Sequence, residues 1–443
     1  MDAKLATIYT AHVTMLKLRH DRAMLETKFE HVAIFSGALH YQFVDDMPYP
    51  FKVNPHFKSW VPVVDNPNCW VLYTPGLKPK LIYWQPVDYW HKPAGTPRET
   101  WVEKFDVIMI ANEDEARQYM PKGRTAFIGE WDSRFAEWAD FTPNDEALLN
   151  SLHYDRAWKT EYEIECIYRA NILGAKGHRA AERAFRAGKS EYEIHIDYLA
   201  AARATEDELP YGNIIALNEN GSVLHYYQHI RERFDEPDRH SFLIDAGASY
   251  LGYASDITRT YSQRNDEFQA LIDAMDRAQQ SLVAAIKPDI DYADIHMLAH
   301  RRVAELLVEF GFVKDLDAEG VLEKRISSTF LPHGVGHLIG LQVHDVGGFM
   351  GDRHGKTIAK PEGHPYLRLT RKIEPGMVFT IEPGFYFIEP LLAELKNADH
   401  SKYVNWEKVD AFRKFGGIRI EDDVLVLENG VDNLTRRAFD NVV

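Results

Sequence analysis

The sequence has few cysteines and no long apolar run, and these two shortages exclude several classes of protein. Only two of its 443 residues are cysteines, Cys69 and Cys166, and they do not form a CxxC pair. They support neither a disulfide framework nor a zinc knuckle, and they fit a reducing compartment. No segment approaches the roughly 18 apolar residues of a membrane span, and the N-terminus has no signal-peptide core. We therefore expect a cytoplasmic protein with no membrane contact.

An excess of basic residues is absent as well. The formal net charge is −16 and the sequence pI is about 5.7. Sequence-independent nucleic-acid binding needs a basic face, so we expect no nucleic-acid partner. The content of 45% hydrophobic and 27% charged residues is typical of a soluble globular protein. A chain of this length exceeds a single hydrophobic core, which predicts two domains.

The pattern of predicted helices and strands changes near residue 158, which divides the chain into 1–158 and 159–443. In the first part, strand-like runs alternate with helical stretches such as 112–120 and 144–152, which predicts an α/β domain. Two aromatic-rich segments, 41–62 and 83–93, are interpreted as long surface loops at a subunit contact or a pocket rim. The strand-like runs are 31–35, 70–74, 80–84, 107–111 and 125–129.

Helices and antiparallel strands are expected in the second part, which predicts an α+β domain. Two helices begin at capping boxes, Thr160 with Glu163 and Ser190 with Glu193. The remainder after residue 311 is predicted to be mostly strand and loop. The further elements expected are two helices over 266–286 and 292–311 and a hairpin over 213–227 with its turn at 219–222.

The chemically informative residues begin with Asp245 and Asp256. An apolar strand ends at Asp245, a glycine-bearing turn follows, and a second short run carries Asp256. A hairpin folded between Tyr250 and Leu251 would place the two carboxylates opposite each other, about 4.5 to 5.5 Å apart. Such a pair repels, and burial raises the cost unless a cation neutralises it. The alternative interpretation is a pair of ordinary turn aspartates.

Three histidines, His333, His337 and His344, lie in the segment LPHGVGHLIGLQVHD. Its glycines allow the backbone to approach a site closely, and HExxH is absent. Histidines elsewhere, such as His178 and His300, are interpreted as ordinary surface residues.

Two glutamates, Glu382 and Glu421, stand at the ends of apolar strands. Arg419 shares a strand face with Glu421 and could pair with it. Taken alone, each glutamate is more often structural than functional.

Together these residues suit two hard or borderline divalent ions, and Mn²⁺ matches the set better than a metal selected by thiolates. Two such ions about 3.5 to 4 Å apart share a bridging hydroxide and polarise a carbonyl group. The sequence therefore predicts metal-dependent hydrolysis.

The ordered set of Asp245, Asp256, HGVGH, IEPG and IRIED resembles the pita-bread metallopeptidases. The segments FVDDMPYPFKVNP, YWQPVDYWHK, PYGNI and LRLTRKIEP are similar to the bacterial Xaa-Pro dipeptidase (prolidase) group of that family, and the likeness covers essentially the whole chain. It implies a pita-bread second domain, two Mn²⁺ ions and hydrolysis of dipeptides that end in proline. Close relatives also cleave organophosphates, which implies a side activity of that kind.

The resemblance further implies a role for individual residues. Asp256 and Glu421 would bridge the metals, Glu382 would also act as acid and base, and His344, supported by His333, would steady the substrate carbonyl. Asp45 and Trp90 would reach the site from the partner subunit of a homodimer. The implied metal ligands are Asp245, Asp256, His337, Glu382 and Glu421; the implied catalytic residues are Glu382, His344, His333 and Arg419; the implied substrate-binding residues are His225, Arg368, Tyr292, Val343, Leu367, Asp45 and Trp90.

Two alternatives remain open from the sequence. An aminopeptidase P shares the same metal ligands but acts on longer Xaa-Pro peptides. A pita-bread protein without catalysis could be a binding module, although such a protein is expected to lose ligands that this chain keeps.

Overall fold

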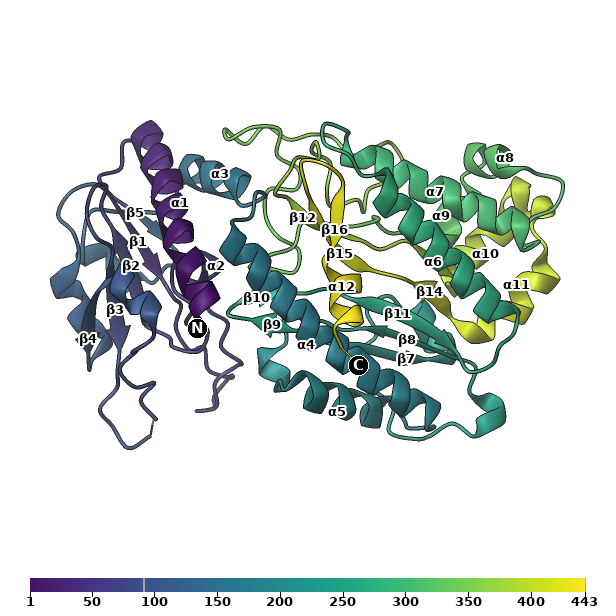
Figure 1. Ribbon diagram of the computed structural model, residues 1–443, viewed down its shortest axis with the longest axis horizontal. Coiled ribbons are helices and arrows are strands. Elements are labelled where there is room, and N and C mark those ends of the chain that lie inside the picture. The colour runs from purple at the N-terminus through teal and green to yellow at the C-terminus, as the bar shows by residue number, and fades with distance from the viewer. Residues whose placement is uncertain (91, 443) are drawn as a thin grey trace. The chain divides into compact units, whose positions relative to one another are not determined.

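The computed structural model describes residues 1–90 and 92–442, and its contacts divide the chain into two compact units. Unit 1 consists of Met1–Cys166, Leu251–Tyr253 and Gly351–Lys356, and unit 2 contains the other described residues. Figure 1 shows both, with the sheet of unit 1 in purple to blue. Among the described residues, the helices are all too short or too polar to cross a membrane.

A mixed six-stranded sheet with the order β4-β3-β2-β1-β5-β6 forms the centre of unit 1. The central strand β1 (His31–Phe35) pairs antiparallel with β2 (Trp70–Tyr73) and parallel with β5 (Thr125–Ile128). The other strands are β3 (Lys80–Trp84), β4 (Asp106–Ile110) and β6 (Phe141–Pro143). All five strands predicted for this domain are present, and its α/β class is confirmed. The edge strand β6 was not predicted because it has only three residues and ends in proline.

Helices accompany this sheet, and an aromatic core covers one of its faces. The α-helices of unit 1 are α1 (Ala3–Thr27), α2 (Pro55–Trp60) and α3 (Glu146–Asp155), and the predicted helix at 112–120 is a 3-10 helix, η2 (Glu113–Tyr119). On one face of the sheet Phe35 and Trp70 lie 4.6 Å apart between ring centroids, and Phe135 packs against both. Fully burying aromatic side chains of this kind contributes about 1.5 to 3 kcal/mol each.

Unit 2 contains the four long helices that were expected. Both capping boxes are present: Thr160 and Ser190 exchange side-chain and backbone hydrogen bonds with the glutamates three residues on. The long helices are α4 (Glu161–Arg186), which begins in unit 1, α5 (Glu191–Ala202), α6 (Glu267–Ala285) and α7 (Tyr292–Glu309). The region expected to be strand and loop also forms five short helices: α8 (Ala318–Glu323), α9 (Ile326–Phe330), α10 (Glu389–Asn397), α11 (Trp406–Phe412) and α12 (Leu434–Asp440).

Short antiparallel sheets make up the rest of unit 2, in agreement with the α+β prediction. Strands are ordered β11-β8-β7, β12-β15-β16, β13-β14 and β10-β9. Their bounds are β7 (Ile214–Leu217), β8 (Ser241–Asp245), β9 (Ser249–Tyr250), β10 (Tyr253–Ala254), β11 (Thr258–Ser262), β12 (Val378–Ile381), β13 (Gly384–Tyr386), β14 (Gly417–Arg419), β15 (Asp422–Val426) and β16 (Val431–Asn433).

The hairpin predicted over 213–227 is wrong. Strand β7 pairs with β8 instead, and residues Asn218–Ser222 form the 3-10 helix η5. Asn218 has a positive φ of 56°, and its side chain accepts hydrogen bonds from the backbone of His240 and Ser241. These bonds bring the end of β7 to the start of β8. Strand β7 therefore pairs with the more distant β8 and not with the residues that directly follow its turn.

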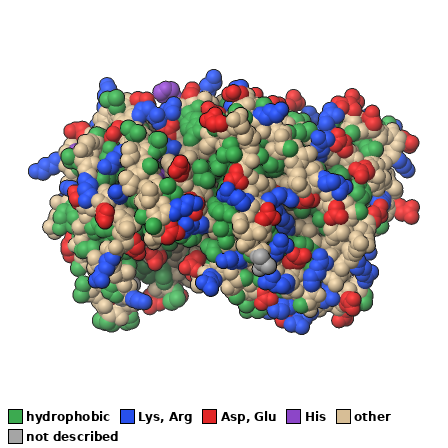
Figure 2. Space-filling view, viewed as in Figure 1, with side chains coloured by type: hydrophobic (Ala, Val, Ile, Leu, Met, Phe, Trp, Pro, Cys, Tyr) green, Lys and Arg blue, Asp and Glu red, His purple; other side chains and the backbone are tan. Residues whose placement is uncertain are grey.

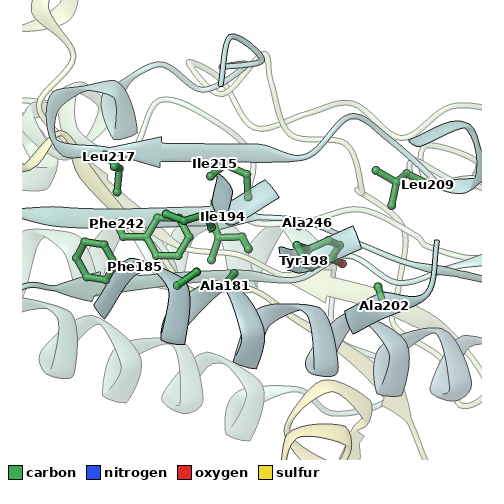
Figure 3. Packing of buried hydrophobic residues seen from close by; sticks show 12 residues of the cluster. Ala181, Phe185, Ile194, Tyr198, Ala202, Leu209, Ile215, Leu217, Phe242 and Ala246 are labelled. Carbon is green, nitrogen blue, oxygen red and sulfur yellow. The ribbon is translucent and has the colours of Figure 1, made fainter. Parts of the chain in front are cut away.

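A hydrophobic core of unit 2 lies between α4, α5 and the β8-β7 strands. Phe185 of α4 packs against Phe242 of β8 with ring centroids 5.2 Å apart, and Figure 3 shows Ile215 and Leu217 of β7 facing the same cluster. Tyr198 of α5 donates a hydrogen bond to the backbone of Gly247, two residues after β8 ends. This core therefore anchors the strand that ends at Asp245.

Charged side chains of both signs cover the molecular surface that Figure 2 shows. Acidic and basic groups are interspersed there, with Lys and Arg more frequent over α4 and α5.

Candidate metal centre

The register of the β8–β11 pair differs from the prediction. Asp245 pairs with Thr258, so it does not lie directly opposite Asp256. The reason is the turn, which is centred on Leu251 and Gly252; both have positive φ, as a two-residue type I′ turn requires. Moving the turn by one residue shifts each cross-strand partner by two, which keeps both aspartates on one sheet face.

The two aspartates nevertheless converge, because Tyr211 connects them. Its hydroxyl lies 2.8 Å from Asp245 Oδ1 and 2.6 Å from Asp256 Oδ1. Tyr211 lies three residues before β7, the strand that pairs with β8. The sequence analysis did not assign Tyr211 a role, although its PYGNI segment formed part of the family likeness.

His337 reaches this pair from the glycine-rich loop after α9. Its Nε2 lies 3.3 Å from Asp256 Oδ2 and 3.7 Å from Glu382 Oε1. Its Nδ1 is 3.0 Å from the carbonyl oxygen of Leu338, so an Nδ1 proton donated there leaves Nε2 as a lone pair for a metal.

Glycines allow that loop to pack tightly, as expected. A Cβ on Gly336 would collide with the backbone of Thr380 and with the hydroxyl of Tyr292. A Cβ on Gly334 would lie 2.8 Å from Cα of Leu367. The close packing carries His337 against β12, where its backbone N–H donates to Thr380 Oγ1.

The two glutamates occupy the strand ends at which they were predicted. Glu382 follows β12, and Glu421 lies between β14 and β15 and is 2% exposed. Thr258 donates a hydrogen bond to Glu421 Oε2 at 2.6 Å and pairs with Glu421 through an isolated β-bridge. The bridge joins the sheet that carries the aspartates to the strands that carry the glutamates.

Arg419 forms a loose ion pair with Glu421, as the sequence suggested, and a closer one with Asp245. Its Nη2 lies 2.6 Å from Asp245 Oδ2, whereas its Nε is 4.0 Å from Glu421 Oε2. The same guanidinium donates to the hydroxyl of Tyr386, which also lies 2.8 Å from His333 Nε2. Arg419 thus neutralises one aspartate and connects to the supporting histidine through Tyr386.

The electrostatics of the group favour a bound cation. Burial raises the pKa of Asp245 despite the opposing charge of Arg419, and it raises the pKa of Glu382 to about 7. Burial and the charges of Asp256 and Glu382 raise the pKa of Glu421 well above its usual value. For Asp256 burial acts in the same direction, but the hydrogen bond and charge of His337 outweigh it and lower the pKa. Divalent ions would relieve this repulsion.

The substrate-binding candidates of unit 2 fall into two groups. His344 packs edge-on against His337, with ring centroids 4.4 Å apart. Burial and the charges of His337, Arg368 and His225 lower the pKa of His344, so the substrate-binding candidates Arg368 and His225 are near enough to act on that ring. Tyr292 and Leu367 are fully buried, and Tyr292 donates its hydroxyl proton to the carbonyl of Thr380. Val343 is half-buried beside His344.

The remaining two candidates belong to unit 1. Asp45 is exposed in the first aromatic-rich loop and Trp90 is 76% exposed in the second.

Three members of the group, Asp256, His337 and Glu421, each offer a ligand atom within 4.8 Å of the others. Four carboxylates and one imidazole are the donors that hard or borderline divalent ions prefer, so the residues present fit such ions. Buried strand ends that converge on donors of this kind define a metal-dependent hydrolase.

The chain belongs to metallopeptidase family M24, whose model matches residues 165–428, and the model of the Xaa-Pro dipeptidase N-terminal domain matches residues 7–154. All five residues of the candidate centre lie in the first of these matches. The chain is therefore a metal-dependent hydrolase with the fold that the sequence predicted.

Relatives resemble the chain along its whole length. It is 49% identical over 441 residues to the Xaa-Pro dipeptidase of Pseudoalteromonas haloplanktis, covering 98% of this chain and 99% of that protein. It is 49% identical over 436 residues to the Xaa-Pro dipeptidase of Stenotrophomonas maltophilia strain K279a, covering 98% and 97%.

Solved structures share the fold at lower identity. Escherichia coli aminopeptidase P with the inhibitor Pro-Leu aligns with a TM-score of 0.69 at 22% identity, covering 95% of each chain. Proline aminopeptidase P II from Yersinia pestis aligns with a TM-score of 0.69 at 22% identity, covering 99% of this chain and 97% of that one. These alignments confirm the pita-bread fold.

Proposed function

We propose that this protein is an Xaa-Pro dipeptidase, which hydrolyses dipeptides with a C-terminal proline. The observation that carries the proposal is the 49% identity, over nearly the whole of both chains, to proteins of that name. The likeness to aminopeptidase P is 22% and concerns the fold. An Xaa-Pro bond is a tertiary amide without an N–H group, and its ring restricts the backbone, so a specialised site is needed to accept it.

We infer that Asp245, Asp256, His337, Glu382 and Glu421 hold two divalent ions per chain, and that Mn²⁺ is the physiological metal. When bound, such ions supply a water activated at neutral pH and a polarised substrate carbonyl. The oxygen-rich donor set supports Mn²⁺ over metals that select thiolates.

Glu382 has the properties that a general acid and base requires. Burial raises its pKa to about 7, so at neutral pH it can accept a proton from the attacking water and return it. The proton is delivered to the proline nitrogen as the C–N bond breaks, because this nitrogen has no proton of its own and leaves as a secondary amine. His333 Nδ1 lies 3.7 Å from Glu382 Oε2 and helps to position that carboxylate.

The substrate is held by groups around His344. Its lowered pKa keeps the ring neutral, so one nitrogen can donate a hydrogen bond to the carbonyl oxygen as negative charge develops there. The exposed guanidinium of Arg368 offers a planar fork for the proline carboxylate, and His225, also exposed, is near enough to His344 for its charge to act on that ring. Val343, which is half-buried, provides apolar surface for the proline ring, and the fully buried Leu367 would support such a pocket from behind.

We further propose that two copies form a homodimer in the cytoplasm. Large apolar side chains in the two loops of unit 1 that carry Asp45 and Trp90 are exposed to an extent unusual for a monomer surface, including Phe43 at 95%, Tyr89 at 87% and Trp90 at 76%. Covering them with a partner subunit would bring Asp45 and Trp90 to the rim of the partner's site. Light scattering on the purified protein measures its mass in solution, and a mass of two chains is expected for the homodimer.

The test of the function is hydrolysis of Gly-Pro, Ala-Pro, Leu-Pro and Ala-Pro-Ala by metal-stripped protein, before and after Mn²⁺ is added. We expect cleavage of the dipeptides only, restored by Mn²⁺ and lost in Glu382→Gln, which keeps the shape of the side chain. Cleavage of the tripeptide would identify an aminopeptidase P, and inactivity with every metal would identify a binding module.

A further inference from the structure

A second group of histidines in unit 2 is separate from the candidate metal centre. His296 and His300 lie on α7, and His364 lies in the loop that precedes Arg368. The three rings are 4.5 to 4.8 Å apart between centroids, and one nitrogen of each lies within 4.8 Å of the others. Sequence analysis treated His300 as a surface residue, but it is 2% exposed and His296 is 1% exposed.

Local geometry explains the convergence. His296 and His300 are four residues apart on one helix, so their side chains share a face one turn apart. His364 follows Gly363, whose φ of 83° reverses the chain, and its backbone N–H donates to the carbonyl of Pro361. The turn directs the third imidazole at the helical pair.

Two buried ring nitrogens of this group have no hydrogen-bond partner among the described residues: Nε2 of His300 and Nδ1 of His296. His300 Nδ1 lies 3.2 Å from Ser327 Oγ, and an Nδ1 proton donated to Ser327 leaves the lone pair on Nε2. The other nitrogen of His296 lies 2.9 Å from His364 Nδ1. A buried nitrogen lone pair that accepts no hydrogen bond costs free energy. Coordination of a metal ion by that lone pair would remove the cost.

The protonation states suit a metal as well. Burial lowers the pKa of His296 to about 2 and that of His300 to about 3, and the neighbouring imidazoles add to both shifts. Burial also lowers the pKa of His364. At neutral pH the cluster therefore consists of three uncharged imidazoles, the form that binds metal.

A cavity connects the cluster to solvent. It has a volume of about 530 Å³, and His300 and His364 are part of its wall. Three carboxylates, of Asp294, Glu319 and Glu362, lie along it together with Arg301 and Arg325. Arg301 pairs with Glu319 at 2.8 Å, and Arg325 pairs more loosely with Glu362 at 3.8 Å. A small cation and a water molecule can enter by this route.

We propose that His296, His300 and His364 form a separate site for one zinc-like divalent cation, with a water from the cavity as the fourth ligand. Three imidazoles without a carboxylate favour Zn²⁺ over the Mn²⁺ inferred for the carboxylate-rich centre. A tetrahedral Zn²⁺ with bonds of about 2.0 to 2.1 Å holds nitrogens about 3.4 Å apart, so the ring nitrogens, which lie within 4.8 Å of one another, would draw closer on binding. Bound metal would connect α7 to the loop that carries His364 and, four residues later, Arg368.

The experiment measures metal content of the purified full-length protein after incubation with Mn²⁺ and a small excess of Zn²⁺, followed by desalting. We expect wild type to retain one more Zn²⁺ per chain than His364→Gln, and the X-ray absorption of that additional ion to fit three imidazoles. His300→Gln should lose the same equivalent. His354→Gln, a change at an exposed histidine of unit 1, should match wild type.

Equal Zn²⁺ contents in wild type, His364→Gln and His300→Gln would overturn the proposal. His364 is half-buried on a loop, so its replacement is tolerated by the fold even if that of the buried His300 is not; circular dichroism checks both. The readout is a difference between variants, so it stands even if the peptidase activity or the dinuclear centre proposed above is wrong.

Discussion

At the scale of single residues, the candidate centre depends on side chains that are not themselves metal donors. Tyr211 donates to both aspartates, Thr258 donates to Glu421, and Arg419 neutralises Asp245. Such partners orient the donors and lower the cost of gathering negative charge in a buried place. Removing one should weaken metal binding while the donors themselves remain.

Tyr211→Phe is the sharpest test of this idea. It removes one hydroxyl and leaves the ring, so Asp245 and Asp256 lose their shared donor without a change in packing. We expect metal affinity to fall about 10- to 100-fold, as for other partners of metal ligands, and activity to recover at high Mn²⁺. Metal retained after dialysis measures the effect, and Tyr119→Phe, at an exposed tyrosine of η2 in unit 1, is the control. Unchanged retention in Tyr211→Phe would contradict the assignment.

His20 of α1 makes the stability of unit 1 sensitive to acid. Burial lowers its pKa to about 4, below the value near 6.5 of an unfolded chain. The folded state then binds fewer protons than the unfolded one between these two pKa values. The contribution of His20 to the free energy of unfolding is therefore fully present above pH 6.5 and is lost as the pH falls toward 4. The loss reaches roughly 2 kcal/mol at pH 5.

The variant His20→Gln removes this titration. Urea midpoints at pH 7 and pH 5 should differ less in His20→Gln than in wild type, whatever the variant costs at pH 7. The same pH dependence in both proteins would show that His20 does not take up the proton on unfolding.

At the scale of secondary-structure elements, packing between helices overrides local preference. Helix α4 contains Gly177 at a point where Tyr198 of α5 crosses closely, and a Cβ there would lie 2.6 Å from Cδ2 of that ring. Glycine in a helix normally costs about 1 kcal/mol relative to alanine. The close approach of the Tyr198 ring explains why glycine is present at position 177. The hydroxyl of Tyr198 in turn donates a hydrogen bond to the carbonyl oxygen of Gly247, after β8.

Gly177→Ala therefore gives two opposite expectations. Helix propensity alone predicts a gain of about 1 kcal/mol, whereas overpacking against Tyr198 predicts a loss of about 1 to 3 kcal/mol. We expect the loss, measured as a lower urea midpoint. Lys176→Ala, at the exposed neighbouring position, should change stability by less than about 0.5 kcal/mol. A more stable Gly177→Ala protein would refute the packing explanation.

At the scale of the whole molecule, the five proposed metal ligands all belong to unit 2, yet they come from separate sheets and loops. Ions bound there would hold together β8, the loop after α9, β12 and β15. Without the ions, the like charges of the four carboxylates repel one another and oppose this arrangement. Metal binding should therefore contribute to the stability of unit 2 by mass action.

Chelation tests this contribution. At a free metal concentration 100 times the dissociation constant, bound metal adds about 2.7 kcal/mol for each independent site. For the two proposed ions this amounts to about 5.4 kcal/mol, so stripping both should lower the melting temperature of unit 2 by about 11 to 22 °C, since each kcal/mol corresponds to about 2 to 4 °C for a domain of this size. Calorimetry with EDTA and after readdition of Mn²⁺ measures it. A melting temperature indifferent to both would count against a metal centre.

Much of the fold could be predicted because its signals are local. Short strand-like apolar runs marked β1 to β5, and the capping boxes at Thr160 and Ser190 marked the starts of α4 and α5. The hairpin after β7 and the register of Asp245 were wrong because each depends on where a turn closes and which distant strand competes for pairing. Short helices such as α8 and α9 have too few residues to show a period.

The sequence by itself determined the chemistry of the candidate centre and the family, because residue types, their order and their positions at strand ends are properties of the chain. Only the tertiary structure decided that Arg419 pairs with Asp245, that Tyr211 connects the aspartates, and that His364 joins His296 and His300. Hydrogen bonds and ion pairs act over a few ångströms, and these partners are separated by up to 174 residues, so folding alone brings them within reach.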